Sequence, residues 1–169
     1  MSSNEIKNLV LPNCNITPQN YRVIDAFMSR SAQPTKSNID WLAKNNVTDI
    51  ISFRRDNEGF LADFNEQLYA ESRNIKFHNI PSFACSPNEE NVGKFLDIIE
   101  GVKEKGGHVH IHCMEGADRT GMYAYIYERL YGLKSSQEAY KNLVKGGWHK
   151  IDFPQIAKFA ESFCKKIRL

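Results

Sequence analysis

Long apolar segments are missing from this 169-residue sequence, and none approaches the roughly 18 residues of a membrane-spanning helix. No early apolar run follows a basic start, so we expect no signal peptide, no transmembrane segment and a cytoplasmic location. Export by a route that needs no such signal is left open. The sequence also lacks internal repeats and low-complexity segments. We therefore expect an extended polar arm over residues 1–20 and one domain over residues 21–169.

An excess of one charge is also absent, because 22 Lys and Arg residues face 20 Asp and Glu residues and leave a formal net charge of +2. This balance gives no indication of a nucleic-acid partner. The four cysteines, Cys14, Cys85, Cys113 and Cys164, form no C-x-x-C pair and no zinc-ligand spacing. A chain long enough to build its own core needs no disulfide framework, so we expect reduced cysteines and a monomer.

Strand and helix patterns alternate along the chain. Val47–Phe53 is apolar and β-branched without alternation, which is typical of a strand buried on both faces. Other strands are expected at residues 22–27, 75–80 and 108–112, a polar loop at 29–36, and helices at 37–45, 60–72, 86–105, 120–130, 135–145 and 152–167. This alternation predicts an α/β fold with a mainly parallel sheet of about four to five strands and helices on both faces. Ligands bind beyond the carboxyl ends of such strands.

Polar residues mark the expected helix starts. We expect Ser37 or Asn38 to cap the first helix and Ser86 to cap the third. Ser135 with Glu138 predicts a capping box at a later helix.

One stretch carries the chemistry. Residues 108–121 read H-V-H-I-H-C-M-E-G-A-D-R-T-G, a short β-favouring run followed by a loop and a helix start. Unpaired backbone N–H groups converge at such a junction and the helix dipole adds positive potential, so the stretch predicts an anion site. The loop amides are expected to form a cup for phosphate oxygens, and Gly116 supplies the positive φ that the curvature needs.

Cys113 and Arg119 bracket this loop. The amides, the helix dipole and the guanidinium each favour the thiolate form of Cys113, which is the nucleophilic form. Arg119 is suited to hold two phosphate oxygens at once, which a lysine does less well. Thr120 is expected to donate its hydroxyl to the sulfur, to cap the helix, or to do both.

His112–Thr120 reads H-C-M-E-G-A-D-R-T and matches the H-C-x-x-G-x-x-R-[ST] signature of the cysteine-based protein tyrosine phosphatases. The longer form H-C-x-x-G-x-D-R-T-G resembles bacterial tyrosine and lipid phosphatases and the small atypical dual-specificity phosphatases. Ser29–Pro34, S-R-S-A-Q-P, and the later run Ile50–Arg54 also look like the amino-terminal half of these enzymes. The resemblance extends over residues 21–146.

The resemblance implies hydrolysis of phosphate monoesters through a phosphocysteine, without a metal or another cofactor. It implies Cys113 as the nucleophile and a phosphate-binding loop of Met114, Glu115, Gly116, Ala117, Asp118 and Arg119. It also implies a supporting role for His112. Arg54 and Asp56 are further supporting candidates, because the charged loop after Phe53 is expected at the same edge of the sheet. The expected substrates are a phosphorylated protein, a small phosphomonoester or a phosphoinositide.

Protonation of the leaving group needs an acid, and residues 79–86, where many relatives carry an aspartate, contain no carboxylate. We favour Asp118, because like charge on a bound dianion favours the protonated carboxyl group that a donor needs. Asp56 is the next candidate, followed by Glu89 or Glu90. Asp118 has a second interpretation, in which it orients Arg119 or the neighbouring backbone.

Several alternatives remain at this stage. Glu115 and Ala117 argue mildly against a highly charged lipid headgroup, whereas Arg54 and Arg55 favour one if either reaches the pocket. A phosphoinositide phosphatase and a non-catalytic phosphate-binding module therefore stay open. A metal-dependent hydrolase stays open because three imidazoles share one strand side, namely His108, His110 and His112. A rhodanese-like sulfurtransferase would not explain the D-R-T-G ending. Cys85 or Cys164 is a candidate disulfide partner of Cys113.

Overall fold

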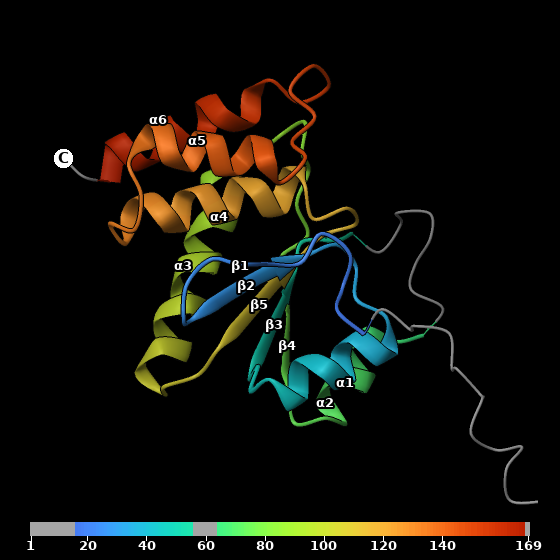
Figure 1. Cartoon of the computed structure of the whole chain (residues 1–169). Coiled ribbons are helices and arrows are strands. Elements are labelled where there is room, and N and C mark those ends of the chain that lie inside the picture. Colours follow the sequence, from blue (N-terminus) through green and yellow to red (C-terminus); the bar gives the residue numbers. More distant parts are fainter. Residues whose placement is uncertain (1–15, 56–63, 168–169) are drawn as a thin grey trace, which may run out of the picture.

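The computed structural model describes residues 16–55 and 64–167. Five strands form one sheet in the order β1-β2-β5-β3-β4 (Figure 1). Their bounds are β1 Arg22–Val23, β2 Met28–Ser31, β3 Asp49–Ser52, β4 Lys76–Asn79 and β5 Val109–His112. β1 is antiparallel to β2, and the other neighbouring pairs are parallel. The predicted mainly parallel sheet is thus confirmed, with β5, the strand that leads to Cys113, at its centre.

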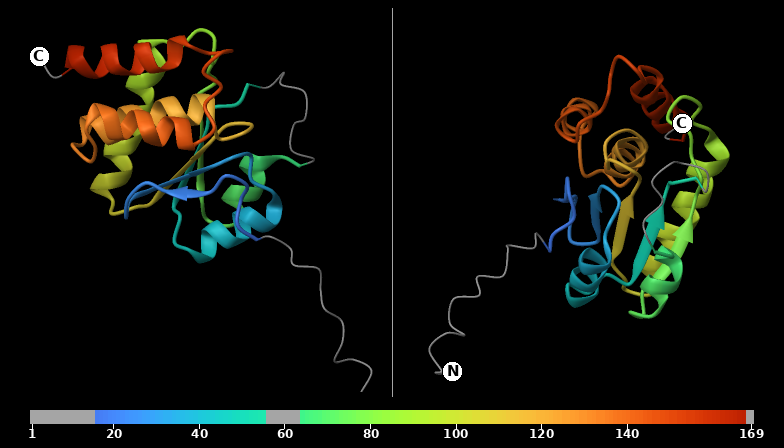
Figure 2. Two further views of the ribbon diagram at one scale, coloured as in Figure 1. Left: turned by 45° about the horizontal axis from the view of Figure 1, so that its top comes forward. Right: turned by 90° about the vertical axis from the view of Figure 1, so that its right-hand side faces the viewer.

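Helices cover both faces of this sheet (Figure 2). Their bounds are α1 Lys36–Lys44, α2 Glu66–Glu71, α3 Glu89–Glu104, α4 Asp118–Leu130, α5 Ser136–Lys145 and α6 Gln155–Ile167. α1 and α2 share one apolar core with the sheet, while α3, α4 and α6 enclose a larger core on the opposite face. α5 packs against α4. None of the helices in the described ranges has the length and apolarity needed to cross a bilayer.

The burial of β3 on both faces explains why apolar and polar residues do not alternate in its sequence. The neighbouring residues Ile50 and Ile51 point to opposite faces, and each is fully buried in a different core. Burying a side chain of this size is worth about 1.5–3 kcal/mol, so both faces of the strand stabilise the sheet. The strand is therefore held firmly, and its carboxyl end is a fixed edge for the loops that follow.

The amino-terminal hairpin differs from the sequence prediction. Only Arg22–Val23 of the expected strand 22–27 pairs in the sheet, because the Asp25 carboxylate accepts hydrogen bonds from the backbone N–H groups of Phe27 and Met28 and turns the chain. The predicted polar loop over residues 29–36 was wrong in its first half, where β2 is a fully buried strand. Polar residues are tolerated there because their hydrogen bonds are made inside the fold.

His110 on β5 satisfies two of these buried hydroxyl groups. Its Nδ1 lies 2.9 Å from Ser29 Oγ and its Nε2 lies 2.8 Å from Ser31 Oγ. Burial, together with the charges of neighbouring histidines, holds the pKa of His110 well below its usual range. The ring is therefore a neutral structural link between β2 and β5.

Three helices begin at other residues than expected: α2 at Glu66, α4 at Asp118 and α6 at Gln155, where the sequence predicted residues 60, 120 and 152. Residues 60–63 of the predicted helix 60–72 lie outside the described residues. The caps of two further helices also differ. α1 begins after Thr35, whose hydroxyl accepts from the backbone N–H of Asn38, so Asn38 lies inside the helix. α3 begins after Asn88 instead of Ser86. The capping box at Ser135 is confirmed, with α5 beginning at the next residue. These differences arise because several side chains near each start can cap, and tertiary contacts select among them.

Candidate active site

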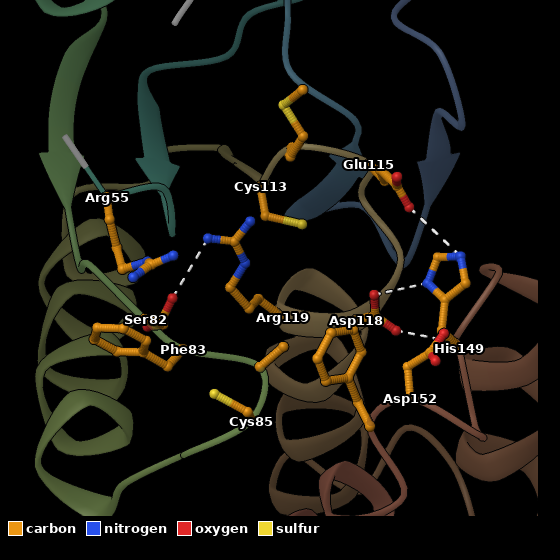
Figure 3. Close-up of a pocket in the computed structure, with 13 residues that line it drawn as sticks. Arg55, Ser82, Phe83, Cys85, Cys113, Glu115, Asp118, Arg119, His149 and Asp152 are labelled. Carbon is orange, nitrogen blue, oxygen red and sulfur yellow. Dashed lines mark hydrogen bonds and ion pairs between the residues drawn. The ribbon is translucent and has the colours of Figure 1, made fainter. Parts of the chain in front are cut away.

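The loop between β5 and α4 forms the floor of a pocket of about 470 Å³ at the carboxyl edge of the sheet (Figure 3). Cys113 follows β5 directly and is 3% exposed, yet its sulfur is directed into this pocket. Arg119 lies in the first turn of α4 and lines the same pocket. The remaining walls come from residues 82–85 and from Arg55, His149, Asp152 and Phe153.

The backbone carbonyls of the loop are held from outside the pocket. The carbonyl of residue 114 accepts a hydrogen bond from the backbone N–H of Gln33 at 3.0 Å. The carbonyls of residues 115 and 116 accept from Asn20 Nδ2 at 3.2 Å and from Arg30 Nη2 at 2.6 Å. A trans peptide directs its N–H opposite to its C=O, so the following amides turn toward the pocket. This is the arrangement that a tetrahedral oxyanion requires.

Gly116 is needed for both its backbone conformation and its lack of a side chain. Its φ of +70° lies in the left-handed region, where an L side chain is strained. A Cβ on Gly116 would lie 2.4 Å from the backbone carbon and oxygen of Ser31, far inside contact distance. The loop can therefore approach β2 closely only with glycine at this position.

Replacing Gly116 by alanine is expected to lower the free energy of unfolding by about 1–3 kcal/mol and to displace the loop amides. Chemical denaturation measures the first effect and the affinity for inorganic phosphate measures the second. Gly93→Ala is the matched control, because Gly93 lies in α3 with nothing within 4 Å of an added Cβ. That control is expected to be neutral or stabilising by about 0.5–1 kcal/mol. Unchanged phosphate affinity in Gly116→Ala would contradict the assigned role of the loop.

Arg30 supports the loop from behind and was not singled out from the sequence. It is buried, and its Nη2 holds the Gly116 carbonyl. Burial lowers the pKa of Arg30 to about 10, with Cys113 and Glu128 acting against that shift. The guanidinium thus remains charged at neutral pH and places a positive charge behind the loop. A Cβ on Gly146 would lie 2.6 Å from Arg30 Nη2, so a small residue gives the guanidinium its space.

Arg119 is held at the wall of the pocket by two backbone carbonyls. Its Nη1 donates to the Phe53 carbonyl at 3.1 Å. The same Nη1 donates to the Ser82 carbonyl at 3.4 Å (Figure 3). These carbonyls follow β3 and β4, two strands next to or near β5 in the sheet. The guanidinium orientation is therefore set by the same sheet edge that positions Cys113.

His112 is held from below by a residue that the sequence analysis missed. Its ring Nδ1 lies 3.1 Å from the Cys113 carbonyl oxygen, and its Nε2 lies 2.7 Å from Glu66 Oε1. Burial alone would raise the pKa of Glu66, but His112 and Gln33 outweigh it and hold the pKa below its usual value. Gln33 also accepts a hydrogen bond from Arg54 Nη1 at 2.8 Å. Arg54 therefore joins a buried chain of contacts beneath the loop.

Asp118 contacts a second residue that sequence reasoning missed. Its carboxylate accepts hydrogen bonds from the His149 backbone N–H and from His149 Nδ1, both at 2.8 Å (Figure 3). The hydrogen bond and charge of Asp118 raise the pKa of His149; Glu115 and Asp152 act in the same direction and burial opposes them. His149 follows Gly146, Gly147 and Trp148 in the turn between α5 and α6, where no sequence motif marks it.

The remaining predicted residues are distributed as follows. Asp56 lies outside the described residues. Glu89 binds Lys166, Glu90 binds Lys94, and neither lines the pocket. The buried Thr120 Oγ1 has no hydrogen-bond partner within residues 16–55 and 64–167, so neither the expected bond to sulfur nor the expected helix cap is formed here. Thr120 lies inside α4, which begins at Asp118.

The mouth of the pocket carries an aromatic and a cationic group. The Arg55 guanidinium carbon lies 4.0 Å from the centre of the Phe83 ring, and both residues line the pocket. Phe83 is 47% exposed. Cys85 lies on the same wall and is exposed, whereas Cys164 is buried in the α6 core. Only Cys85 of the two thus shares the pocket with Cys113.

The β5 histidines do not converge on a metal site, because His110 contacts serine hydroxyls and His112 contacts Glu66. Within the described part of the chain, metal-type donor atoms lie within 4.8 Å of one another at Glu115, Asp118 and His149. There, hydrogen bonds from His149 already occupy both Asp118 oxygens. We interpret this cluster as a hydrogen-bonded acid–base group.

Comparison with known proteins agrees with this geometry. The dual specificity protein phosphatase TpbA of Pseudomonas aeruginosa (strain UCBPP-PA14) is 24% identical over 123 residues, which are 73% of this chain and 52% of that protein. The chain thus spans about half the length of this relative. A crystal structure of a TpbA variant in complex with pTyr gives a TM-score of 0.69 at 20% identity, covering 83% of this chain and 82% of the other. The core catalytic domain of the PP-IP phosphatase SIW14 from S. cerevisiae gives a TM-score of 0.70 at 18% identity, covering 89% and 91%.

These structural likenesses establish the fold. A family model described as "DSP-PTPase phosphatase fused to NAD+ Kinase" matches residues 15–160, which is most of the chain. The chain therefore belongs to this family of dual-specificity-type phosphatase domains.

Proposed function

We propose that the chain hydrolyses phosphate monoesters by a metal-independent route through a phosphocysteine at Cys113. The observation that carries this proposal is the sulfur of Cys113 directed into an open pocket, with inward-turned amides around it and Arg119 on the wall. The sulfur attacks phosphorus, and the bond from phosphorus to the leaving oxygen breaks as that oxygen takes a proton. Water then attacks the phosphocysteine, and the sulfur leaves as thiolate.

Arg119 and the loop amides hold the three non-reacting oxygens. In the transition state, negative charge is spread over these three oxygens. Donors that are already in place stabilise this charge without reorganisation. Thr120 is one helical residue further on, and its buried hydroxyl is available to donate to the sulfur as negative charge returns there. Asp118 lines the pocket and is the proposed proton donor to the leaving oxygen.

A protein side chain that carries an aryl phosphate, such as phosphotyrosine, is the substrate class that best fits the residues lining the pocket. Phe83 offers an exposed ring at the mouth, on which an aryl group can stack. The opposite wall carries Glu115, Asp118 and Asp152, so it is unfavourable for additional phosphate groups. The TpbA variant, a structural relative, was crystallised with pTyr.

A phosphoinositide or another polyphosphorylated inositol is the second candidate. One observation favours it, since Arg55 lines the pocket and brings a second guanidinium to its mouth. The yeast relative is described as a PP-IP phosphatase. The two candidates differ in whether the acidic wall or the Arg55 wall contacts the part of the substrate beyond the scissile phosphate.

Phosphate release tests these proposals directly. We expect release from a phosphotyrosyl peptide and from para-nitrophenyl phosphate, with slower release from a phosphoinositide in mixed micelles. EDTA is expected to leave each rate unchanged, because the proposed site uses no metal. Loss of activity with EDTA would favour the metal-dependent alternative, and binding of the peptide without release would indicate a non-catalytic module.

A further inference from the structure

The turn between α5 and α6 brings His149 against the proposed proton donor. We propose that His149 positions Asp118 and shares one proton with it. The pair, rather than Asp118 alone, then supplies the proton that the leaving oxygen takes. This inference rests on the proposed phosphatase function and concerns the source of the proton in its first step. His149 is a positioning residue, because it acts on the substrate through Asp118.

The contact is geometrically well defined. Two donors from one residue, the backbone N–H and Nδ1 of His149, reach the two oxygens of Asp118 at 2.8 Å each. Asp118 is fixed in the first turn of α4, and its side chain is 12% exposed. The imidazole is 44% exposed on its outer side, so a proton can enter from solvent. The carboxyl group is therefore held between the ring and the pocket (Figure 3).

The turn that carries His149 is itself held in place. The His149 carbonyl accepts from the backbone N–H of Phe153 at 2.9 Å, and Trp148 Nε1 donates to the Phe153 carbonyl at 3.0 Å. Trp148 is also buried against the core of α4 and α6. The ring thus approaches Asp118 from a fixed segment and not from a loose side chain on the surface.

The acidic groups around the His149 ring favour the protonated form of the His149–Asp118 pair. Asp118 on α4, Glu115 in the loop and Asp152 before α6 all face His149, and His149 Nε2 lies 3.6 Å from Glu115. These acids raise the pKa of His149 above its ordinary value of 6.5. Because a raised pKa keeps the base protonated to higher pH, the ring beside Asp118 holds a proton to higher pH than an unperturbed histidine would.

The proton balance of the reaction follows. Before the reaction the pair holds one proton between Nδ1 and the Asp118 carboxylate. A phosphate dianion in the pocket disfavours negative charge on the nearby Asp118 carboxylate. The proton therefore moves to Asp118 and leaves the His149 ring neutral. The leaving oxygen takes this proton as its bond to phosphorus breaks. In the second step the attacking water returns one proton to the pair.

A comparison of two substrates at several pH values tests this inference. His149→Asn keeps an N–H donor near the Nδ1 position but cannot hold the shared proton. We expect kcat/KM for a poor leaving group, phenyl phosphate, to fall by about 10²-fold, and its alkaline limb to move to lower pH. A good leaving group, 2,4-dinitrophenyl phosphate, needs no proton, and its rate is expected to change by less than about threefold. His149→Gln is a second variant that lacks the ring.

Asp118→Asn and the double variant complete the test. The losses of the two single variants on phenyl phosphate are expected not to add, because both remove the same proton. His78→Asn is the matched control. His78 makes a similar 2.7 Å contact with Asp49 on β3, away from the pocket, and its loss is expected to leave both rates unchanged.

The outcomes separate this inference from the proposed function. Equal losses on both substrates in the His149 variants, or an unmoved alkaline limb, would show that His149 has a structural role only. If the unaltered chain releases no phosphate, or if Cys113→Ser retains turnover, the proposed function fails and the inference falls with it. Additive losses in the double variant would show that the two residues act separately.

Discussion

Replacing Cys113 by serine is expected to lower kcat by at least about 10⁴-fold while leaving phosphate affinity nearly unchanged. A serine hydroxyl is not ionised at neutral pH, so the variant lacks the attacking anion. The oxygen occupies nearly the same place as the sulfur, and the loop carbonyls remain held by Gln33, Asn20 and Arg30. Phosphate release measures the loss, and calorimetric titration with phosphotyrosine measures the retained affinity.

Cys85→Ser provides the matched control for this prediction. Cys85 lines the same pocket and is the more exposed thiol, so it reports any general effect of removing a sulfur there. We expect its kcat to stay within about threefold of the unaltered chain. Loss of turnover in Cys85→Ser but not in Cys113→Ser would show that Cys85, and not Cys113, is the nucleophile.

Replacing Arg119 by alanine is expected to lower kcat/KM by about 10³-fold or more, because a single donor group aimed at the transition-state charge is worth this much. Arg119→Lys is expected to recover little of the loss. A lysine keeps the charge, but it cannot donate to two phosphate oxygens while also donating to the Phe53 and Ser82 carbonyls. Steady-state kinetics on para-nitrophenyl phosphate measure both variants.

Arg55→Ala is the companion to the Arg119 variants. Arg55 is a guanidinium of the same pocket but lies at the mouth against Phe83. We expect its loss to change KM for the phosphotyrosyl peptide more than kcat for the small aryl phosphate. Equal effects of the Arg55 and Arg119 variants on the small substrate would argue against Arg119 as the principal ligand of the scissile phosphate.

The sequence was sufficient for features whose causes are local. The strand, loop and helix around Cys113 follow one another within 14 residues, from 108 to 121, and each has its own pattern. The run Val47–Phe53 indicated a strand buried on both faces because both of its faces are apolar. The parallel sheet then followed from the alternation of strands and helices.

Features that depend on contacts between distant residues escaped prediction. β2 looks like a loop in the sequence, because Ser29, Arg30 and Ser31 are polar and their partners lie about 80 positions away. His149 lies 31 residues from Asp118, and Glu66 meets His112 across the sheet edge. None of these residues has a local pattern that distinguishes it from a surface residue. Such partners become visible only when the chain is folded.

The external support of the loop between β5 and α4 has a consequence for inhibitors. Because Gln33, Asn20 and Arg30 hold its carbonyls from behind, the floor is shaped before any compound arrives, and it will accept vanadate, tungstate and other tetrahedral anions alike. Discrimination must then come from the rim. A compound that stacks on Phe83 and places an amine against Glu115 would use the two features of this pocket that a simple oxyanion does not touch.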